Sequence, residues 1–294
     1  MKRFFQNFAY LAVFMIELVM RKITVITGAS SGLGAEFARQ LFELYENTLK
    51  PAPREIWLIA RSAENLNQTA EKIQSSCKNP PTENSVQIKT FALNLAGTAG
   101  AGDFAALLQN EQKNGNFQIE CLINNAGFGT YGPFDETPAE KEMLMIDLNC
   151  TALTGICGHA LKYLTSGSKI INVSSLAAFM PLGNFAVYAA TKAYVLSFSV
   201  ALAAELRPKG IFVSALCPGS VSTNFANVAS NGKRKEVLHG KDPVKVVRHC
   251  LKKAFKGKKI ILTFAKWKFL AFASRFAGKY AIASLTYRFA KRPH

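Results

Sequence analysis

Tyr188 and Lys192 are two residues whose types and spacing suggest chemistry. They lie four positions apart in the run AVYAATKAYV, so on a helix they would be neighbours on one face. A phenol has a pKa of ~10 and carries protons poorly at neutral pH, whereas a fixed cation beside it favours the phenolate and lowers that pKa. In a sheltered site, a lysine beside a tyrosine would therefore make the phenol a better proton carrier near neutral pH. A packed tyrosine ring beside a solvated lysine would show the same spacing, so the rest of the sequence has to decide.

A glycine-rich stretch, TGASSGLG, places Gly28, Gly32 and Gly34 where a short β-branched run gives way to a helical pattern. Glycine lets the backbone approach a pyrophosphate closely, and a helix N-terminus supplies free N–H groups and the positive end of its dipole. The stretch therefore predicts an anion-binding turn between a first strand and a first helix, of the kind that holds a dinucleotide.

Arg61 follows the next apolar run, IWLIARS, which contains no Asp or Glu. At this place an acidic residue accepts from the free ribose hydroxyl of NAD, whereas an arginine accommodates the 2′-phosphate of NADP. Arg61 thus favours NADP over NAD, although an arginine on an exposed loop would look the same. Residues 46–53, which include two prolines, are read as an enlarged surface loop that lengthens the distance from Gly34.

Apolar strand candidates alternate with helical segments along the chain. Alternation of this kind predicts parallel pairing with helices on both sheet faces, hence an α/β, doubly wound sheet. The 294 residues, 49% of them hydrophobic, suit one large core. Beyond the first strand, further strands are predicted at residues 55–60, 86–93, 119–127, 168–175, 211–219 and 258–264, and helices at 63–76, 101–113, 138–165 and 185–207.

The six cysteines show no CxxC pair and no zinc-module spacing. We read them as reduced core residues of a cytosolic protein. The four histidines fit no catalytic spacing, so we expect no metal site, nucleophilic triad or paired-carboxylate site.

Five motifs in order, TGASSGLG, NNAG (124–127), NVSS (172–175), YAATK (188–192) and PGSVST (218–223), make this sequence similar to the short-chain dehydrogenase/reductase family. The resemblance covers residues 22–264. It implies a Rossmann-type sheet, a nicotinamide cofactor and an active site of Tyr, Lys, Ser and Asn.

The resemblance assigns catalytic roles to four residues. Tyr188 would be the proton donor to a substrate carbonyl, and Lys192 would lower its pKa and hold the nicotinamide ribose. Ser175, at the end of a strand, matches the serine that holds the carbonyl oxygen, whereas Ser174 would point to the opposite face. Asn149, in a predicted helix, matches the asparagine that completes a water relay to the lysine, although a surface Asn would look the same.

The same resemblance implies a set of cofactor-binding residues. Asn94 stands where the family often has an Asp toward the adenine, and its carbonyl can accept the same bond. Asn124 matches a largely structural asparagine. Together with Tyr188 and Lys192, the expected NADP(H) contacts are Gly28, Ser30, Ser31, Gly32, Leu33, Gly34, Arg61, Asn94, Leu95, Asn124, Ala126, Gly127, Pro218, Gly219, Val221 and Thr223.

The two ends fall outside the resemblance. Residues 1–21 form an apolar N-terminal extension, whose stretch 4–20 is short for a membrane span and carries Glu17. It is either a helix lying on a membrane or on the protein, or a sign that the chain naturally starts at Met20. Residues 265–294 are expected to form a basic aromatic helix, and much of the net charge of +17 lies beyond Lys233. This helix could contact anionic lipid, cap its own domain or form a subunit contact.

The sequence thus predicts a single Rossmann catalytic domain, residues 22–264, in an NADPH-dependent oxidoreductase. Its substrate would carry a carbonyl and be bulky and apolar, as a steroid-like or lipid ketone or a 3-oxoacyl thioester, because charge is nearly absent around the motifs. Residues 224–242 would form a lid, with the basic run 233–235 near the phosphates of a thioester arm. We further expect a homodimer or homotetramer, cytoplasmic or peripheral at the inner face of a membrane, without nucleic-acid binding. The alternative is a non-catalytic NADP-binding regulatory protein.

Overall fold

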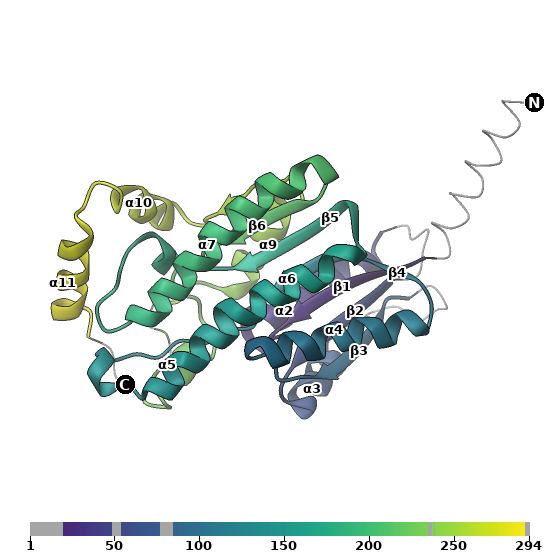
Figure 1. Ribbon diagram of the computed structural model, residues 1–294, viewed down its shortest axis with the longest axis horizontal. Coiled ribbons are helices and arrows are strands. Elements are labelled where there is room, and N and C mark those ends of the chain that lie inside the picture. The colour runs from purple at the N-terminus through teal and green to yellow at the C-terminus, as the bar shows by residue number, and fades with distance from the viewer. Residues whose placement is uncertain (1–19, 49–53, 77–84, 235–236, 238, 292–294) are drawn as a thin grey trace, which may run out of the picture.

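The computed structural model describes residues 20–48, 54–76, 85–234, 237 and 239–291. Seven parallel strands form one sheet in the order β3-β2-β1-β4-β5-β6-β7 (Figure 1). The order changes direction between β1 and β4, which is where open α/β sheets bind ligands. The predicted doubly wound, Rossmann-type sheet is confirmed. The strands are β1 (Arg21–Thr27), β2 (Arg54–Ala60), β3 (Gln87–Ala92), β4 (Phe117–Asn124), β5 (Leu164–Val173), β6 (Phe212–Leu216) and β7 (Ile260–Ile261).

Helices cover both faces of the sheet because consecutive strand side chains point to opposite faces. In β2, Ile56 and Leu58 join one core cluster, whereas Trp57 and Ile59 join the other. The helices α2 (Gly32–Glu46), α3 (Ala63–Ser75) and α9 (Pro243–Ala254) supply the first cluster, and α4 (Gly97–Lys113), α6 (Leu153–Ala160) and α7 (Ala186–Leu206) supply the second, in front of the sheet in Figure 1. Each fully buried Ile or Leu contributes roughly 1.5 to 3 kcal/mol, so both faces are needed for stability.

The helix α7 carries the predicted catalytic pair on its buried face. Tyr188 and Lys192 recur at helical spacing with Val195, Ser199 and Leu202 among its buried residues. This face packs against the sheet, so both reactive side chains are held by the same contacts that build the core.

The predicted helix 138–165 is divided in the structure. It consists of α5 (Ala139–Ile146), a π-helical stretch η2 (Asp147–Ala152), α6 and a short 3-10 turn η3 (Leu161–Tyr163). A π-helical turn widens the helix and is frequent at functional sites. The turn contains Asn149, one of the predicted catalytic residues.

Two helical stretches, Ala139–Tyr163 and Ala186–Lys209, are long and apolar enough by composition to cross a membrane. In each, 44% of the apolar window is buried inside the fold. They include α5, α6 and α7, and side chains from α6 and α7 join the second core cluster, as in the core helices of a globular domain. The apolar stretch 4–20 lies almost wholly outside the described residues.

The C-terminal region forms two helices instead of the single predicted one. After β7 the chain forms α10 (Ala265–Ala273) and α11 (Lys279–Phe289). Trp267 is buried and belongs to the first core cluster, so the fold continues past the predicted domain limit at residue 264. The remaining short helices are α8 (Phe225–Ala229), η1 (Phe134–Glu136), η4 (Leu176–Phe179) and η5 (Arg207–Lys209).

Candidate active site

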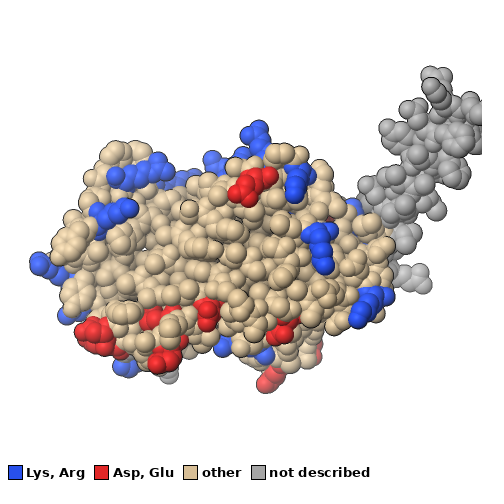
Figure 2. All heavy atoms as spheres, viewed as in Figure 1, with Lys and Arg blue, Asp and Glu red and all other residues tan. Residues whose placement is uncertain are grey.

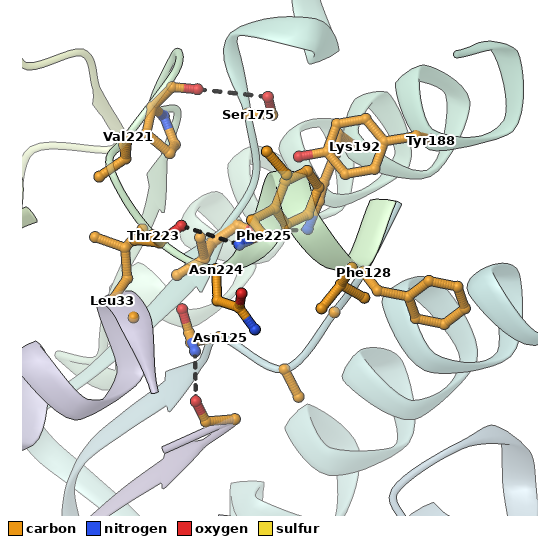
Figure 3. A pocket seen from close by; sticks show the side chains of 18 of the residues that line it. Leu33, Asn125, Phe128, Ser175, Tyr188, Lys192, Val221, Thr223, Asn224 and Phe225 are labelled. Carbon is orange, nitrogen blue, oxygen red and sulfur yellow. Dashed lines mark hydrogen bonds between the residues drawn. The ribbon is translucent and has the colours of Figure 1, made fainter. Parts of the chain in front are cut away.

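One cavity of about 1130 Å³ lies at the carboxyl ends of the strands. Among the predicted site residues, only Asn149, Gly34 and Asn124 do not line it. A single drug-sized ligand usually occupies ~300 to 1,000 Å³, so the cavity can hold a dinucleotide together with a substrate. Figure 3 shows side chains from several separate segments pointing into this space.

The turn after β1 is built for close backbone approach. Gly28 and Gly32 have φ values of 64° and 57°, a region that favours glycine. A Cβ on Gly34 would lie 2.2 Å from the Gly28 carbonyl oxygen, so the helix start can sit close to the strand end only without a side chain. Gly34 therefore permits the tight turn without lining the cavity, whereas Ser30, Ser31 and Leu33 line it.

Asn125, not Asn124, braces this turn from the neighbouring strand. Its Nδ2 donates to the carbonyl oxygens of Thr27 and Gly28, both at 3.1 Å, and Figure 3 shows one of these hydrogen bonds. Asn124, which we expected at the cofactor, instead donates to Asn172 Oδ1 at 2.9 Å, and its side chain is buried below the cavity floor. Consecutive residues at a strand end point to opposite sides, which is why the NNAG motif supplies one bracing and one structural asparagine.

Tyr188 lies in an aromatic cluster at one end of the cavity. Its ring stacks on Phe185 with centroids 4.1 Å apart and meets Phe225 at 5.4 Å. A side chain on Gly129 would collide with both Phe185 and Tyr188 at 2.9 Å. The ring is thus fixed on three sides, and Figure 3 shows its hydroxyl directed into the cavity.

Lys192 is buried behind Tyr188. Its Nζ donates to the Val173 carbonyl oxygen at 3.0 Å and lies 5.6 Å from the centroid of the Tyr188 ring. Burial lowers the pKa of Lys192 to about 8, although nearby Cys150 and Cys217 act in the opposite direction. No carboxylate among the described residues lines the cavity, so the ammonium group has no counter-charge there.

Ser175 and Ser174 point in different directions, as the alternation of β5 predicts. The Ser175 hydroxyl donates to the Pro218 carbonyl oxygen at 3.4 Å (Figure 3) and accepts from the Ala177 N–H at 3.1 Å. The Ser174 hydroxyl donates to the Lys192 carbonyl oxygen at 2.7 Å and is occupied with α7. Ser175 is therefore the serine whose long, weak hydrogen bond leaves it available to a ligand.

Asn149 acts on the cavity wall from the π-helical turn. Its Oδ1 accepts from the Phe128 N–H at 3.1 Å, and its Nδ2 donates to the Phe128 carbonyl oxygen at 2.9 Å and to Thr191. A Cβ on Gly127 would lie 2.7 Å from Asn149 Oδ1 and 3.4 Å from Lys192 Nζ. Asn149 thus positions the loop that follows NNAG, and the absence of a side chain at Gly127 keeps the space before Lys192 open.

Arg61 lies at the exposed rim of the cavity, next to Ser62 and Asn65. Ser62 caps α3 by accepting from the Asn65 N–H at 3.2 Å, so these two polar residues come with the helix start. Asn94 and Leu95 line the same part of the cavity. Sequence reasoning missed Ser62 and Asn65, although a serine after the strand is a typical helix-capping signal.

The C-terminal helix α10 contributes a wall that sequence reasoning also missed. Trp267 and Leu270 line the cavity together with Lys266. A Cβ on Gly219 would lie 2.3 Å from Trp267 Nε1, so the PG turn and α10 pack without a gap. Spacing of three residues between Trp267 and Leu270 could have indicated this second, inward face.

Comparison with known proteins identifies the family. The family described as short chain dehydrogenase matches residues 22–234. The chain therefore belongs to the short-chain dehydrogenase/reductase family, and it is an oxidoreductase of that family.

Two curated relatives are named for two different classes of substrate. The human very-long-chain 3-oxoacyl-CoA reductase is 28% identical over 236 residues, which cover 78% of this chain and 67% of that protein. The mouse 17-beta-hydroxysteroid dehydrogenase type 3 is 31% identical over 221 residues, which cover 74% of this chain and 65% of that protein.

Solved structures show the same fold with either nicotinamide cofactor. A short-chain dehydrogenase from Sphingobium yanoikuyae in complex with NADPH has a TM-score of 0.68 and 26% identity, covering 87% of this chain and 94% of that chain. A Burkholderia phymatum member in complex with NAD has a TM-score of 0.71 and 19% identity, covering 94% of this chain and 97% of that chain. The glycine turn, the N-terminus of α2 and the open space before Lys192 fit a nicotinamide dinucleotide in the present cavity.

Proposed function

We propose that the protein is an NADPH-dependent reductase of a carbonyl group on a bulky, largely apolar substrate. The observation that carries this proposal is the cavity itself. Tyr188, Ser175 and the buried Lys192 meet aromatic and aliphatic side chains at one end, and Arg61 lies at its rim. The reactive groups thus lie at an end of the cavity whose walls favour an apolar ligand.

NADPH is preferred over NADH in this proposal because of charge. The described lining residues include Arg61, Lys192, Arg234, Lys241 and Lys266, and no Asp or Glu. An acidic residue at the end of β2 would repel a 2′-phosphate, whereas Arg61 can donate charge-assisted hydrogen bonds to it. Ser62 and Asn65 add neutral donors beside Arg61.

When bound, the nicotinamide would supply a hydride to the carbonyl carbon. The protein's own part is to bind and protonate the carbonyl oxygen. Ser175 can donate a hydrogen bond to that oxygen, and Tyr188 can deliver the proton from the same side of the cavity. The Lys192 ammonium stabilises the phenolate that remains, because a cation close to a new negative charge acts strongly in a buried site. Phe185 and Phe225 hold the phenol ring in place.

The substrate class follows from the walls around Tyr188. Each buried hydroxyl of a sugar would cost roughly 1 to 3 kcal/mol where no partner accepts it, whereas an apolar body gains from burial. Phe179 and Met180, although apolar and close to the motifs in the chain, do not line the cavity; the apolar and aromatic residues that do include Phe128, Tyr131, Leu176, Ala177, Leu182, Phe185, Val221 and Phe225.

A 3-oxoacyl thioester is one form of this substrate, and a steroid-like or lipid ketone is the other. Arg234 lines the cavity, and Lys233 lies next to it in the chain, so both could meet the phosphates of a thioester arm. Lys235, the third residue of the basic run, lies outside the described residues. The human 3-oxoacyl-CoA reductase and the mouse hydroxysteroid dehydrogenase represent these two substrate classes among the relatives.

Loss of NADPH absorbance with a panel of substrates tests the proposal. Steroid ketones, fatty ketones and 3-oxoacyl-CoA thioesters should be reduced, and small sugars should not. If only thioesters react, neutralising Lys233 and Arg234 should raise KM for them, whereas neutralising Lys113 and Lys162 should not. Tight NADPH binding without turnover on any carbonyl would contradict the proposal and support a non-catalytic NADP-binding regulator.

We also propose that the protein is a homo-oligomer. Large apolar side chains are exposed on α5 and α7, namely Met143, Leu144, Ile146, Tyr194 and Val200. Exposed apolar residues on two adjacent helices suit a contact with a second copy. Light scattering at several concentrations tests this, and a monomer at every concentration would contradict it.

A further inference from the structure

The outer surface of α10 and α11 carries large apolar side chains that the fold does not cover. Phe276, Tyr280 and Phe289 are 76%, 86% and 80% exposed, and Phe269 and Phe272 are also exposed. None of the 11 residues of α11 is buried, although the helix contains several apolar residues. Isolated helices of this length are marginal in water, so this one depends on contacts.

Hydrogen bonds fix α11 to the loop that precedes the catalytic helix. The Gly183 N–H donates to Thr286 Oγ1 at 2.9 Å, and Asn184 Nδ2 donates to the Tyr287 carbonyl oxygen at 3.0 Å. A Cβ on Gly183 would lie 2.5 Å from Tyr287 Cβ, so the helix packs closely against this loop. Tyr280 and Phe289 are therefore exposed on a helix that is anchored to the rest of the domain.

Charge on this part of the molecule has one sign. Figure 2 shows Lys and Arg side chains over α10 and α11, whereas acidic side chains gather over η1 and α5. Between residues 265 and 291 the chain contains no Asp or Glu, and its cations are Lys266, Lys268, Arg275, Lys279, Arg288 and Lys291. Burial and the cations Lys253, Lys268 and Lys252 lower the pKa of nearby His249, which agrees with a positive potential here.

We propose that the surface formed by α10 and α11 docks on an anionic lipid bilayer. Aromatic side chains enter the boundary between headgroups and acyl chains, and flanking Lys and Arg contact anionic headgroups. A water-soluble partner protein would explain the apolar area, but the exclusively basic charged residues of α10 and α11 complement an anionic membrane. The acidic side chains over η1 and α5 leave α10 and α11 as the part of this end that faces the lipid.

Docking would also bring the cavity to the membrane. Trp267 and Leu270 line the cavity on one side of α10, whereas Phe269 and Phe272 are exposed on the other. One helix thus separates the lipid-facing surface from the site. This consequence rests on the proposed function, because only an apolar substrate would reach the site directly from the bilayer.

Flotation of the full-length chain with vesicles tests the docking surface. We expect the protein to float with vesicles that contain phosphatidylserine, to remain below with phosphatidylcholine vesicles, and to dissociate as salt is raised. Substituting Phe272→Ala with Phe276→Ala should weaken flotation roughly tenfold. The matched control is Phe134→Ala with Phe212→Ala, which removes two exposed rings elsewhere and should change little.

Charge reversal separates local from overall electrostatics. Lys268→Glu with Arg275→Glu should weaken binding roughly tenfold or more. Lys113→Glu with Lys162→Glu makes the same change in net charge at the opposite end of the sheet and should preserve most binding. Equal losses in both variants would overturn the proposal, because binding would then follow net charge alone.

Other outcomes assign the surface to another occupant. Flotation that persists in the aromatic variant would place membrane binding elsewhere, including the N-terminal apolar stretch. An oligomer that the Phe272→Ala and Phe276→Ala substitutions dissociate would assign the surface to a second copy. Retained thermal stability in each variant shows that folding is intact. Because flotation needs no turnover, failure of docking and failure of the reductase proposal give different results.

Discussion

The two ends of the β-sheet both bury charged side chains, but they surround them differently. At the amino ends of the strands, Glu55 accepts from Arg21 and Trp57 at 2.9 and 2.7 Å and lies 3.2 Å from Lys89 Nζ. At the carboxyl ends, the buried Lys192 donates to the Val173 carbonyl oxygen, and the described residues that line the cavity include no carboxylate.

The pKa values reflect this difference. Burial raises the pKa of Glu55, but the hydrogen bonds from Trp57 and Arg21 and the charges of Arg21 and Lys89 outweigh it and lower the pKa overall. For Lys192, burial is the largest effect, and it lowers the pKa because it disfavours the charged form. A buried charge with fixed counter-charges is a structural element, whereas one without them costs stability and suits a site where charge develops during reaction.

The largest expected effect concerns the group next to Lys192. Tyr188→Phe removes the proton donor but keeps the ring stacked on Phe185, so turnover should fall by about a thousandfold while NADPH binding stays nearly unchanged. Tyr194→Phe, which removes a hydroxyl that hydrogen-bonds Thr154 on the outer side of α7, is the matched control. Steady-state assays and NADPH titration measure both. Retention of more than about a tenth of the turnover would refute the role of Tyr188.

The next effect tests the other end of the sheet. Glu55→Gln removes one of the two carboxylates, Glu55 and Glu111, that Arg21 and Lys89 share, so the free energy of unfolding should fall by about 1.5 to 3 kcal/mol. The surface variant Glu43→Gln, which breaks an exposed pair with Arg39, should cost less than ~1 kcal/mol. Urea unfolding measures both. The effect of Glu55→Gln should shrink as pH falls below the usual range of a carboxyl, because Glu55 stabilises the fold only while ionised.

The sequence allowed the sheet and most of the cavity to be predicted because both depend on local patterns. Alternating apolar runs predict strands, and the motif residues lie at strand ends, which parallel pairing brings to one edge. Arg61 and Ser175 were located in this way, whereas Tyr188 and Lys192 were located by their spacing of four residues on a helix. Neither the π-helical turn at Asn149 nor the bracing of the glycine-rich turn by Asn125 follows from spacing, because each depends on a neighbouring strand or loop.

The C-terminal wall of the cavity shows a different limit. The helix α10 carries two apolar rows, one with Phe269 and Phe272 and one with Trp267 and Leu270, and the predicted basic aromatic helix did not distinguish them. Periodicity cannot decide which of two rows is buried, because that depends on the shape of the surface the helix meets. Here the indole of Trp267 occupies the space that a side chain at Gly219 would need.

A third, smaller effect concerns the unpaired cation at the cavity rim. Arg61→Ala should reduce the preference for NADPH over NADH by about 10- to 100-fold, mainly through KM, because charge-assisted hydrogen bonds to the 2′-phosphate are lost. Arg207→Ala removes an exposed arginine at the amino ends of the strands and should leave the preference unchanged. If the wild-type protein uses NADH equally well, Arg61 does not bind the 2′-phosphate. The two ends of the sheet would then differ less in the use of their charged side chains.

The smallest effect tests the buried ammonium group directly, without any turnover. The folded pKa of Lys192 is about 8, below the 10.5 of the unfolded chain, so the unfolded state binds more protons between these two values. The wild-type protein should therefore gain stability as pH rises through this window, by up to ~1.4 kcal/mol per pH unit from this residue.

Lys192→Met removes the titrating group and keeps a similar apolar stem. The difference in unfolding free energy between the two proteins should therefore shift in favour of the wild type as pH rises from 7.5 to 9.5, values chosen to bracket the onset of titration near pH ~8. Other titrating groups are common to both chains and largely cancel in the difference. A constant difference would mean that Lys192 is paired as completely as Glu55, and the contrast between the two ends of the sheet would be lost.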